Sequence, residues 1–317
     1  MAFLLGTDEA GYGPNLGPLT IGSTLWQVPN EAVDLYEAFE TVLSSSRDPS
    51  RLMVADSKQV YSSGQSLRDL ETSVLSFLLT LSGEVPANFG QLADAMGFDL
   101  AGLDYSFPLI AEFGLPVIAL PRDIESNARR LVDVFDETGC RLQAMQTVAV
   151  FPQRFNEMVC RLGNKAELLS SETLLLAGRM LDKRPSGDVS DVSIGCDKHG
   201  GRSKYAGMLN QYLTREFVHV VKESLETSQY SWQQGEANVS IRFNAQGEAW
   251  MPIALSSMMA KYVREIAMLV WNEFWQEKLP GIKPTKGYPM DARRFKKEIA
   301  DLQQSLGIQD QQIWRSR

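Results

Sequence analysis

The sequence has few cysteines and no long apolar run, and both absences narrow the classes of protein to which it can belong. Its three cysteines, among 317 residues, are Cys140, Cys160 and Cys196. Their spacing matches no cysteine metal motif, and such scarcity is typical of a reducing compartment. No stretch is long enough to cross a bilayer, and the N-terminus lacks a basic segment followed by an apolar one. We therefore expect a cytoplasmic protein that does not span a membrane.

Positive charge is also in short supply. The chain has 31 lysines and arginines against 39 aspartates and glutamates, a formal net charge of −8. This acidity argues against broad, non-specific nucleic-acid binding, but it allows a local basic groove, and carboxylates clustered around metal ions add to it. The hydrophobic content of 44% is enough for a substantial core. The length fits one large domain, or a core domain with an added lobe.

A glycine-rich connection at residues 6–18 lies between two apolar runs, residues 1–5 and 19–26. This pattern predicts a strand, a tight turn and a second strand. Asp8 and Glu9 stand where the first strand ends, and the glycines around them let the backbone approach a phosphate closely. Adjacent carboxylates beside such a loop suit metal-assisted phosphoryl chemistry. An acidic hairpin turn is the alternative, since aspartate and glycine are ordinary turn residues.

The run Asp-Glu-Ala-Gly-Tyr-Gly-Pro-Asn-Leu-Gly-Pro, residues 8–18, resembles the first motif of the type 2 ribonucleases H, the ribonuclease HII family. In that family Asp-Glu-Ala-Gly is followed by Arg-Gly-Pro and a second Gly-Pro, so Tyr12 stands where the family has arginine. The resemblance implies that Gly11, Tyr12 and Gly13 bind the nucleic acid. Tyrosine cannot supply the charge of arginine, but its ring can stack on a base or a sugar.

Two shorter segments follow in the family's order. Residues 54–58 contain Asp-Ser-Lys, as the family does, which implies that Ser57 and Lys58 bind substrate. The alternative is that Asp56 or Ser57 caps a short helix. Residues 189–197 predict a strand that ends in Asp197, before a pair of glycines, and the family has its third catalytic carboxylate at the end of such a strand. A turn aspartate is the alternative there.

Residues 251–265 give the second strong resemblance. The family pattern is Ala-Ser, two apolar residues, Ala-Lys, two more residues and Arg-Asp, and it implies roles for Lys261, Arg264 and Glu265, with glutamate in place of the family's aspartate. Glu265 lies in an otherwise apolar helical stripe, where an unpaired carboxylate is costly, so a metal ion would explain it. The alternative is a salt bridge with Lys261, four residues earlier. Further on, Lys-Gly-Tyr resembles a family motif whose tyrosine contacts nucleic acid, which implies that Tyr288 binds substrate.

These resemblances imply an α/β, ribonuclease-H-like fold with a mixed five-stranded central sheet and helices on both sides, in a single catalytic domain over residues 1–317. Two segments fall outside the family pattern. Residues 83–147, rich in proline and glycine, are predicted to be an inserted lobe, and residues 223–250 a smaller insertion. Apolar periodicity also predicts helices at 31–44, 67–81, 123–135 and 164–181, and strands at 217–222 and 238–243. Tyr230 and Trp232, in the polar stretch between these two strands, fit a partly buried core better than a groove.

The activity implied by the resemblance is metal-dependent endonucleolytic cleavage of RNA in an RNA–DNA hybrid, or at a ribonucleotide in duplex DNA. Two divalent ions, Mg²⁺ or Mn²⁺, would be held by Asp8, Glu9, Asp197 and Glu265, and the protein would act as a monomer. One alternative is a non-catalytic or substrate-shifted nucleic-acid binding protein on the same fold. Another is a nucleotide-binding enzyme that uses residues 11–17 as a phosphate loop, although no Lys-Ser/Thr closes that loop.

Overall fold

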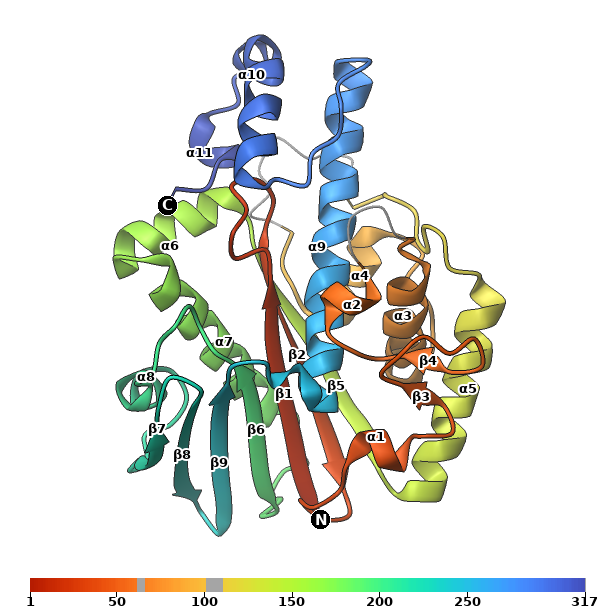
Figure 1. Ribbon diagram of the computed structural model, residues 1–317, viewed down its shortest axis with the longest axis vertical. Helices are drawn as coiled ribbons and strands as arrows, with labels where there is room; N and C mark the ends of the chain where they lie inside the picture. Colours follow the sequence, from red (N-terminus) through yellow and green to blue (C-terminus); the bar gives the residue numbers. More distant parts are fainter. Residues whose placement is uncertain (62–65, 101–110, 317) are drawn as a thin grey trace.

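A single mixed sheet organises the computed structural model, which describes residues 1–61, 66–100 and 111–316. Its seven strands lie in the order β5-β2-β1-β6-β9-β8-β7 (Figure 1). The central strand β1 pairs antiparallel with β2 and parallel with β6, and β6 pairs parallel with β9. Three neighbouring strands therefore end at the same edge of the sheet. The strands are β1 (Ala2–Ala10), β2 (Leu19–Val28), β5 (Arg141–Val150), β6 (Asp191–Asp197), β7 (His219–Glu223), β8 (Thr227–Gln234) and β9 (Ala237–Asn244), and β3 (Leu43–Ser44) and β4 (Leu52–Met53) form a separate parallel pair.

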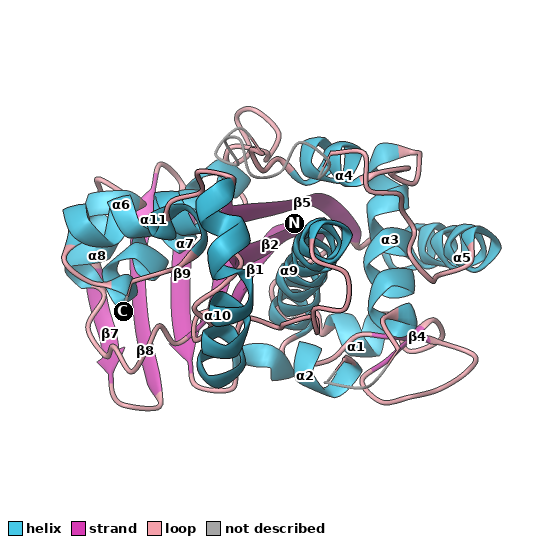
Figure 2. Ribbon diagram, turned by 90° about the horizontal axis from the view of Figure 1, so that it is seen from above, coloured by secondary structure: helices cyan, strands magenta, loops and turns pink. Residues whose placement is uncertain are grey.

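Helices cover both faces of the sheet (Figure 2). The long helix α9 lies on one face of β1 and β2, with α3 and α5 beside it, and α6, α7 and α8 lie on the other face. The second half of α9 packs with α10 and α11. The longer helices are α3 (Arg68–Ser82), α4 (Phe89–Met96), α5 (Pro121–Thr138), α6 (Pro152–Leu162), α7 (Lys165–Leu181), α8 (Ala206–Tyr212), α9 (Met251–Lys278) and α10 (Pro289–Ser305). The short ones are α1 (Leu35–Ala38), α2 (Ser57–Val60), α11 (Asp310–Ile313) and the 3₁₀ helix η1 (Gly247–Ala249).

Two glycines let α9 lie directly on the sheet. A β-carbon on Gly6 would overlap the backbone of Pro252, and one on Gly22 would overlap the carbonyl oxygen of Ser256. The Ser256 hydroxyl lies 3.0 Å from the carbonyl oxygen of Gly6 and 2.7 Å from that of Pro252. Because these contacts involve backbone atoms, they fix the position of α9 along β1. They thereby also fix how deeply the residues at the end of β1 lie beneath this helix.

Aromatic side chains fill the apolar layers on the two faces. On the α9 side, the ring of Trp26 packs against Phe39, Phe77 and Phe135. On the other side, Tyr205 stacks on Phe243 with ring centroids 3.7 Å apart. Burial of such large apolar areas on both faces is the main favourable contribution to folding. The sheet therefore provides a rigid platform for the residues at its edge.

The predicted α/β class, with a mixed sheet and helices on both faces, is confirmed, but the expected number of five strands is wrong. The polar stretch before residue 238 contains β8, in which the alternating residues Ser228, Tyr230 and Trp232 are buried. Those two aromatics therefore belong to the core. The helix expected at 31–44 is also much shorter, because only Leu35–Ala38 is helical and the chain then enters β3.

The two segments predicted as insertions contribute to the central sheet. Residues 83–147 contain α4, α5 and most of β5, which pairs with β2, whereas residues 101–110 lie outside the described residues. Residues 223–250 contain β8, β9 and η1, and β9 pairs with β6. The assignment of the whole chain to one domain with an inserted lobe stays a prediction.

A buried carboxylate ties the segment before α5 to the helices beside the sheet. Glu71, fully buried on α3, accepts hydrogen bonds from the backbone N–H groups of Val117, Ile118 and Ala119, at 2.7–2.8 Å. It also accepts one from the hydroxyl of Tyr262 on α9, at 2.9 Å. Glu71 thus joins α3, α9 and this loop at one point.

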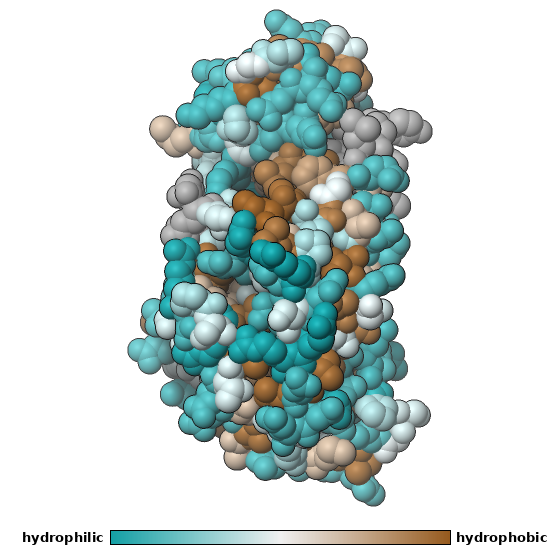
Figure 3. Space-filling model, turned by 90° about the vertical axis from the view of Figure 1, so that its right-hand side faces the viewer, coloured by the Kyte–Doolittle hydropathy of each residue, from teal (hydrophilic) through white to brown (hydrophobic). Residues whose placement is uncertain are grey.

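The face formed by α3, α5 and the segments around them carries apolar side chains in several separate patches among polar ones (Figure 3). Exposed apolar residues on these elements include Val117, Ile118 and Val132. Such scattered exposure is ordinary for a folded protein. No helix in the described ranges combines the length and apolar character that crossing a bilayer needs.

Candidate metal centre

Three carboxylates meet where two parallel strands end. The pairing of β1 with β6 runs up to Thr7 and Cys196, so the next residues, Asp8 and Asp197, lie side by side. One oxygen each from Asp8, Glu9 and Asp197 lies within 4.8 Å of the others. In α/β sheets, ligands bind preferentially beyond the carboxyl ends of the strands. The structure therefore brings together three of the four predicted ligands.

These carboxylates repel one another in a poorly hydrated setting. Burial, followed by the charge of Glu9, raises the pKa of Asp8 well above its usual range. Burial, followed by the charge of Asp197, raises the pKa of Glu9 to about 7. Burial also raises the pKa of Asp197, although the backbone N–H of Gly247 donates to it at 3.4 Å. A divalent cation would relieve this repulsion, and oxygen donors of this kind suit Mg²⁺ and Mn²⁺.

A fourth carboxylate, Glu248, was missed by the sequence reading. It lies in η1, just after β9, the third parallel strand that ends at this edge. Its charge contributes to the raised pKa values of Asp8 and Glu9, and its own pKa is raised by burial and by Asp197. The signal that could have found it is the recurrence of a carboxylate after each of three neighbouring parallel strands.

Glu265, the predicted fourth ligand, has other partners. Its carboxylate oxygens lie 2.6 Å from the Nζ atom of Lys261 and 3.8 Å from that of Lys286. Both lysines also lie over the ring of Tyr61, at 5.4 and 4.8 Å from its centroid. Among the described residues, Glu265 is not part of the carboxylate group around Asp8. The salt bridge considered as the alternative is what the structure contains.

The Asp-Ser-Lys segment borders the centre. Asp56 caps α2 by accepting from the backbone N–H of Lys58 at 2.9 Å, as the capping alternative predicted. The hydroxyl of Ser57 is 3.0 Å from that of Ser257, which in turn hydrogen-bonds to Asp8. Burial lowers the pKa of Lys58, but the surrounding carboxylates more than offset this effect, and the net shift is upward. The Lys58 ammonium is therefore held in the field of the carboxylates.

Arg264 holds the glycine-rich connection between β1 and β2, residues 11–18, which we call the glycine loop. This buried guanidinium donates to the carbonyl oxygens of Leu16 and Lys286, at 3.4 and 3.1 Å. Gly11 adopts a φ of +85°, and a side chain there would overlap Arg264. Arg264 thus positions the loop, whereas Gly13 is exposed and Tyr12 is half-buried beneath the Nζ atom of Lys165, 4.5 Å from the ring centroid.

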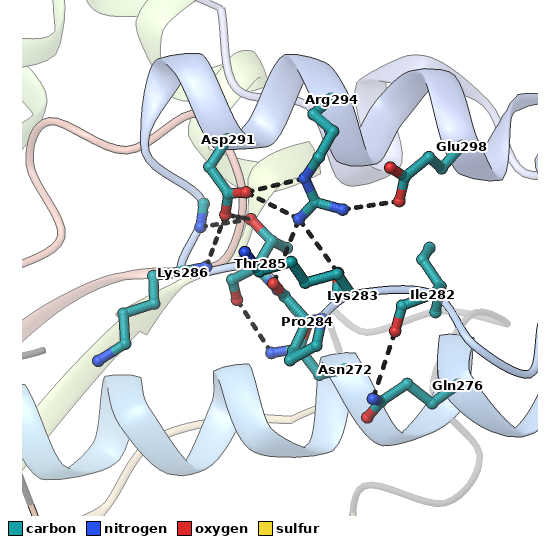
Figure 4. A network of polar contacts seen from close by, with 11 residues as sticks. Asn272, Gln276, Ile282, Lys283, Pro284, Thr285, Lys286, Asp291, Arg294 and Glu298 are labelled. Atoms are coloured by element: carbon teal, nitrogen blue, oxygen red, sulfur yellow. Dashed lines mark hydrogen bonds and ion pairs between the residues drawn. The ribbon is translucent and has the colours of Figure 1, made fainter. Parts of the chain in front are cut away.

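The Lys-Gly-Tyr segment lies against the same loop. A polar network around Asp291 fixes the chain between α9 and α10, and in Figure 4 the side chain of Lys286 extends away from it. Within the network, Thr285 donates to Asp291 at 2.6 Å, and Arg294 does so at 2.7 Å. The carbonyl oxygen of Gly287 accepts from the backbone N–H of Asn15 at 2.8 Å. Tyr288, 53% exposed, follows directly, so its ring is free to contact a ligand near the loop.

We predict that the metal-free protein loses stability as the pH rises from about 5 to about 8. The folded-state pKa of Glu9, about 7, lies above its ordinary value of 4.5. The contribution of Glu9 to the free energy of unfolding, up to about 3 kcal/mol, is therefore fully present below pH 4.5 and is lost as the pH rises past 7. Mn²⁺ should restore stability at pH 8 far more than at pH 5, because it binds the ionised folded site.

Urea denaturation with and without Mn²⁺ at the two pH values measures this effect. Glu9→Gln should flatten the pH dependence and weaken the response to Mn²⁺. An unchanged pH slope in that variant would contradict the assignment of the effect to this cluster.

Comparisons with known proteins give a likeness in structure only. No protein-family model matches the chain, and no curated protein matches its sequence significantly. Among solved structures, the chain is similar to ribonuclease HII of Archaeoglobus fulgidus in its complex with PCNA, with 14% identity, coverage of 99% of this chain and 94% of that one, and a TM-score of 0.40. It is similar to ribonuclease H2 of Pyrococcus horikoshii OT3, with 16% identity, coverage of 98% and 92%, and a TM-score of 0.43. A third similar structure is Bst-RNase HIII in complex with Mn²⁺, with 13% identity, coverage of 99% and 66%, and a TM-score of 0.41.

Proposed function

We propose that this protein is a metal-dependent endonuclease that cleaves the RNA strand of an RNA–DNA hybrid, or a duplex at an embedded ribonucleotide. The observation that carries the proposal is the group formed by Asp8, Glu9 and Asp197, whose oxygens lie within 4.8 Å of one another at the ends of two parallel strands. Three carboxylates held this close, one buried and two partly buried, are unfavourable on their own, and phosphodiester hydrolysis at paired metal ions needs such a group.

The residues around the clustered carboxylates would have separate roles in this reaction. Asp8, Glu9 and Asp197 would hold one or two Mg²⁺ or Mn²⁺ ions, with Glu248 as a further carboxylate on the β9 side. Bound metal supplies an activated water and neutralises charge on the leaving oxygen. Lys58, held in the field of these carboxylates, would neutralise a phosphate of the bound strand. Ser257, which hydrogen-bonds to both Asp8 and Ser57, would keep the Asp8 carboxylate oriented.

The preference for RNA is supported by the glycine loop and the Lys-Gly-Tyr segment. These two family-like motifs are joined by the hydrogen bond from the Asn15 N–H to the Gly287 carbonyl oxygen. Backbone amides at Gly11 and Gly13 can contact a 2′-hydroxyl or a phosphate, and Tyr12 and Tyr288 offer rings for stacking. Lys261 and Lys286, arranged by Glu265, would add positive charge nearby.

The test is cleavage by purified protein of four matched substrates: an RNA–DNA hybrid, a DNA duplex with one ribonucleotide, an all-DNA duplex and single-stranded RNA. We expect cutting of the first two with Mg²⁺ or Mn²⁺, none with EDTA, and none of the all-DNA duplex. Tight binding of the hybrid without cleavage in either metal would instead identify a nucleic-acid binding protein without catalysis.

A further inference from the structure

A second charged feature lies on the other side of the glycine loop. Arg315, only 1% exposed, follows α11 and reaches the loop. Its Nη2 atom donates to the carbonyl oxygen of Gly11 at 2.7 Å and also to that of Pro14. Its backbone N–H donates to the Asn15 carbonyl oxygen at 2.8 Å, and its guanidinium lies 4.8 Å from the ring centroid of Phe155.

The hydrogen-bonding groups and the charge of this buried guanidinium have only some of their partners. Among the described residues it forms no ion pair with a carboxylate, and its Nε and Nη1 atoms have no hydrogen-bond partner. Burial, together with the nearby charge of Arg264, lowers the pKa of Arg315 to about 9. Burying a charge without a counter-charge is expensive, so the site favours an anion close by.

A cavity of about 270 Å³ adjoins Arg315. It is lined by Tyr12, Gly13, Pro14, Asn15, Phe155, Lys165, Pro289 and Ser316. Three of these residues, Pro14, Asn15 and Phe155, are among those that Arg315 contacts. Lys165, which lines the cavity, supplies a second cation with its Nζ atom over the Tyr12 ring, and it too forms no ion pair within the described part of the chain.

We infer that this cavity binds a phosphate group. Lys165 would contact the phosphate directly, and Arg315 would add its charge from behind the wall formed by Pro14 and Phe155. Tyr12 lines the cavity with Lys165 over its ring, and its hydroxyl also feels the carboxylates, because burial and then the charge of Glu9 raise its pKa. The site needs neither metal nor cleavage. If the proposed function holds, the phosphate belongs to the backbone of the bound nucleic acid.

The experiment measures phosphate binding in EDTA, so that the metal centre plays no part. Inorganic phosphate and a single-stranded tetranucleotide, with and without a 5′-phosphate, are titrated by calorimetry at constant ionic strength. We expect saturable binding of inorganic phosphate. The 5′-phosphorylated tetranucleotide should bind more tightly than the tetranucleotide without that phosphate. Lys165→Gln should weaken the affinity for inorganic phosphate and for the 5′-phosphorylated tetranucleotide at least about tenfold, which is the effect of losing one charge-assisted hydrogen bond. Lys183→Gln, which changes an exposed lysine just beyond the other end of α7, should bind as wild type does.

Lys165 is only partly buried and Lys183 is exposed, so neither substitution should affect folding, and their melting curves check this. Arg315→Gln serves as a second variant, with a weaker phosphate affinity expected if it folds. Equal phosphate affinity in Lys165→Gln and wild type, or a heat signal that sodium chloride reproduces, would overturn the inference. Binding of inorganic phosphate without tighter binding of the phosphorylated tetranucleotide supports a site for a free phosphate compound. Failure of cleavage leaves these results unaffected, and failure of phosphate binding leaves the metal centre unaffected.

Discussion

Asp8→Asn is expected to lower metal-dependent cleavage more than about 100-fold, because loss of residues that merely support a metal ligand already costs about 10–100-fold. Asp8 is the most buried of the three clustered carboxylates, lies at the end of the central strand and hydrogen-bonds to Ser257. An amide in its place retains the shape but removes the charge that a divalent ion requires. Single-turnover cleavage of an RNA–DNA hybrid, at several Mn²⁺ concentrations, measures the loss in rate and in metal affinity.

The matched control is Glu265→Gln. Its carboxylate pairs with Lys261 and Lys286, so this variant should keep activity within about tenfold of wild type, mainly through weaker substrate binding. Glu248→Gln should fall between the two. If Glu265→Gln inactivates the protein while Asp8→Asn stays active, the metal centre proposed here is in the wrong place.

Glu71→Gln is expected to destabilise the fold by about 3–5 kcal/mol, because it leaves buried N–H donors facing an amide that cannot accept from all of them. The Glu71 carboxylate accepts from three consecutive backbone N–H groups and from the Tyr262 hydroxyl. Urea denaturation should show a lower midpoint with an unchanged slope.

Glu125→Gln on α5 is the control for this prediction. Glu125 is exposed, and its ion pair with Arg129, at 3.4 Å, lies one helical turn away. Exposed pairs of this kind contribute only about 0.3–0.5 kcal/mol. Similar midpoints for the two variants would show that the Glu71 hydrogen bonds do not carry the stability assigned to them.

Three of the clustered carboxylates were predicted from the sequence. Asp8, Glu9 and Asp197 each stand at the end of an apolar run, but aspartate is also an ordinary turn residue, so it was the resemblance of the surrounding motifs that singled them out. Glu248 was not predicted, because it lies in a 3₁₀ turn that has no periodic pattern of its own, and only its place after a third strand points to it. Only the pairing of β9 with β6, a contact between distant segments, brings it to the same edge.

Glu265 was easy to find in the sequence, but its partner was not. An acidic residue in an apolar helical stripe has to be neutralised, and the sequence does not say whether a metal or a cation does so. Lys261 is visible four residues earlier, but Lys286 arrives through the loop after α9 and its place depends on the network around Asp291. Strand β8 was missed for a related reason, since its buried positions include Ser228, which reads as polar.

The parallel pairing of β1 with β6 also determines when the metal centre can exist during folding. Ala2 pairs with Asp191, so Asp8 and Asp197 meet only after most of the chain has been synthesised and a long loop has been closed. Contacts of such sequence separation form slowly, because the entropy of closing the loop is lost before the contact is gained. A newly made chain therefore lacks the complete carboxylate set, and under the proposed function metal binding would report that the central sheet has been assembled.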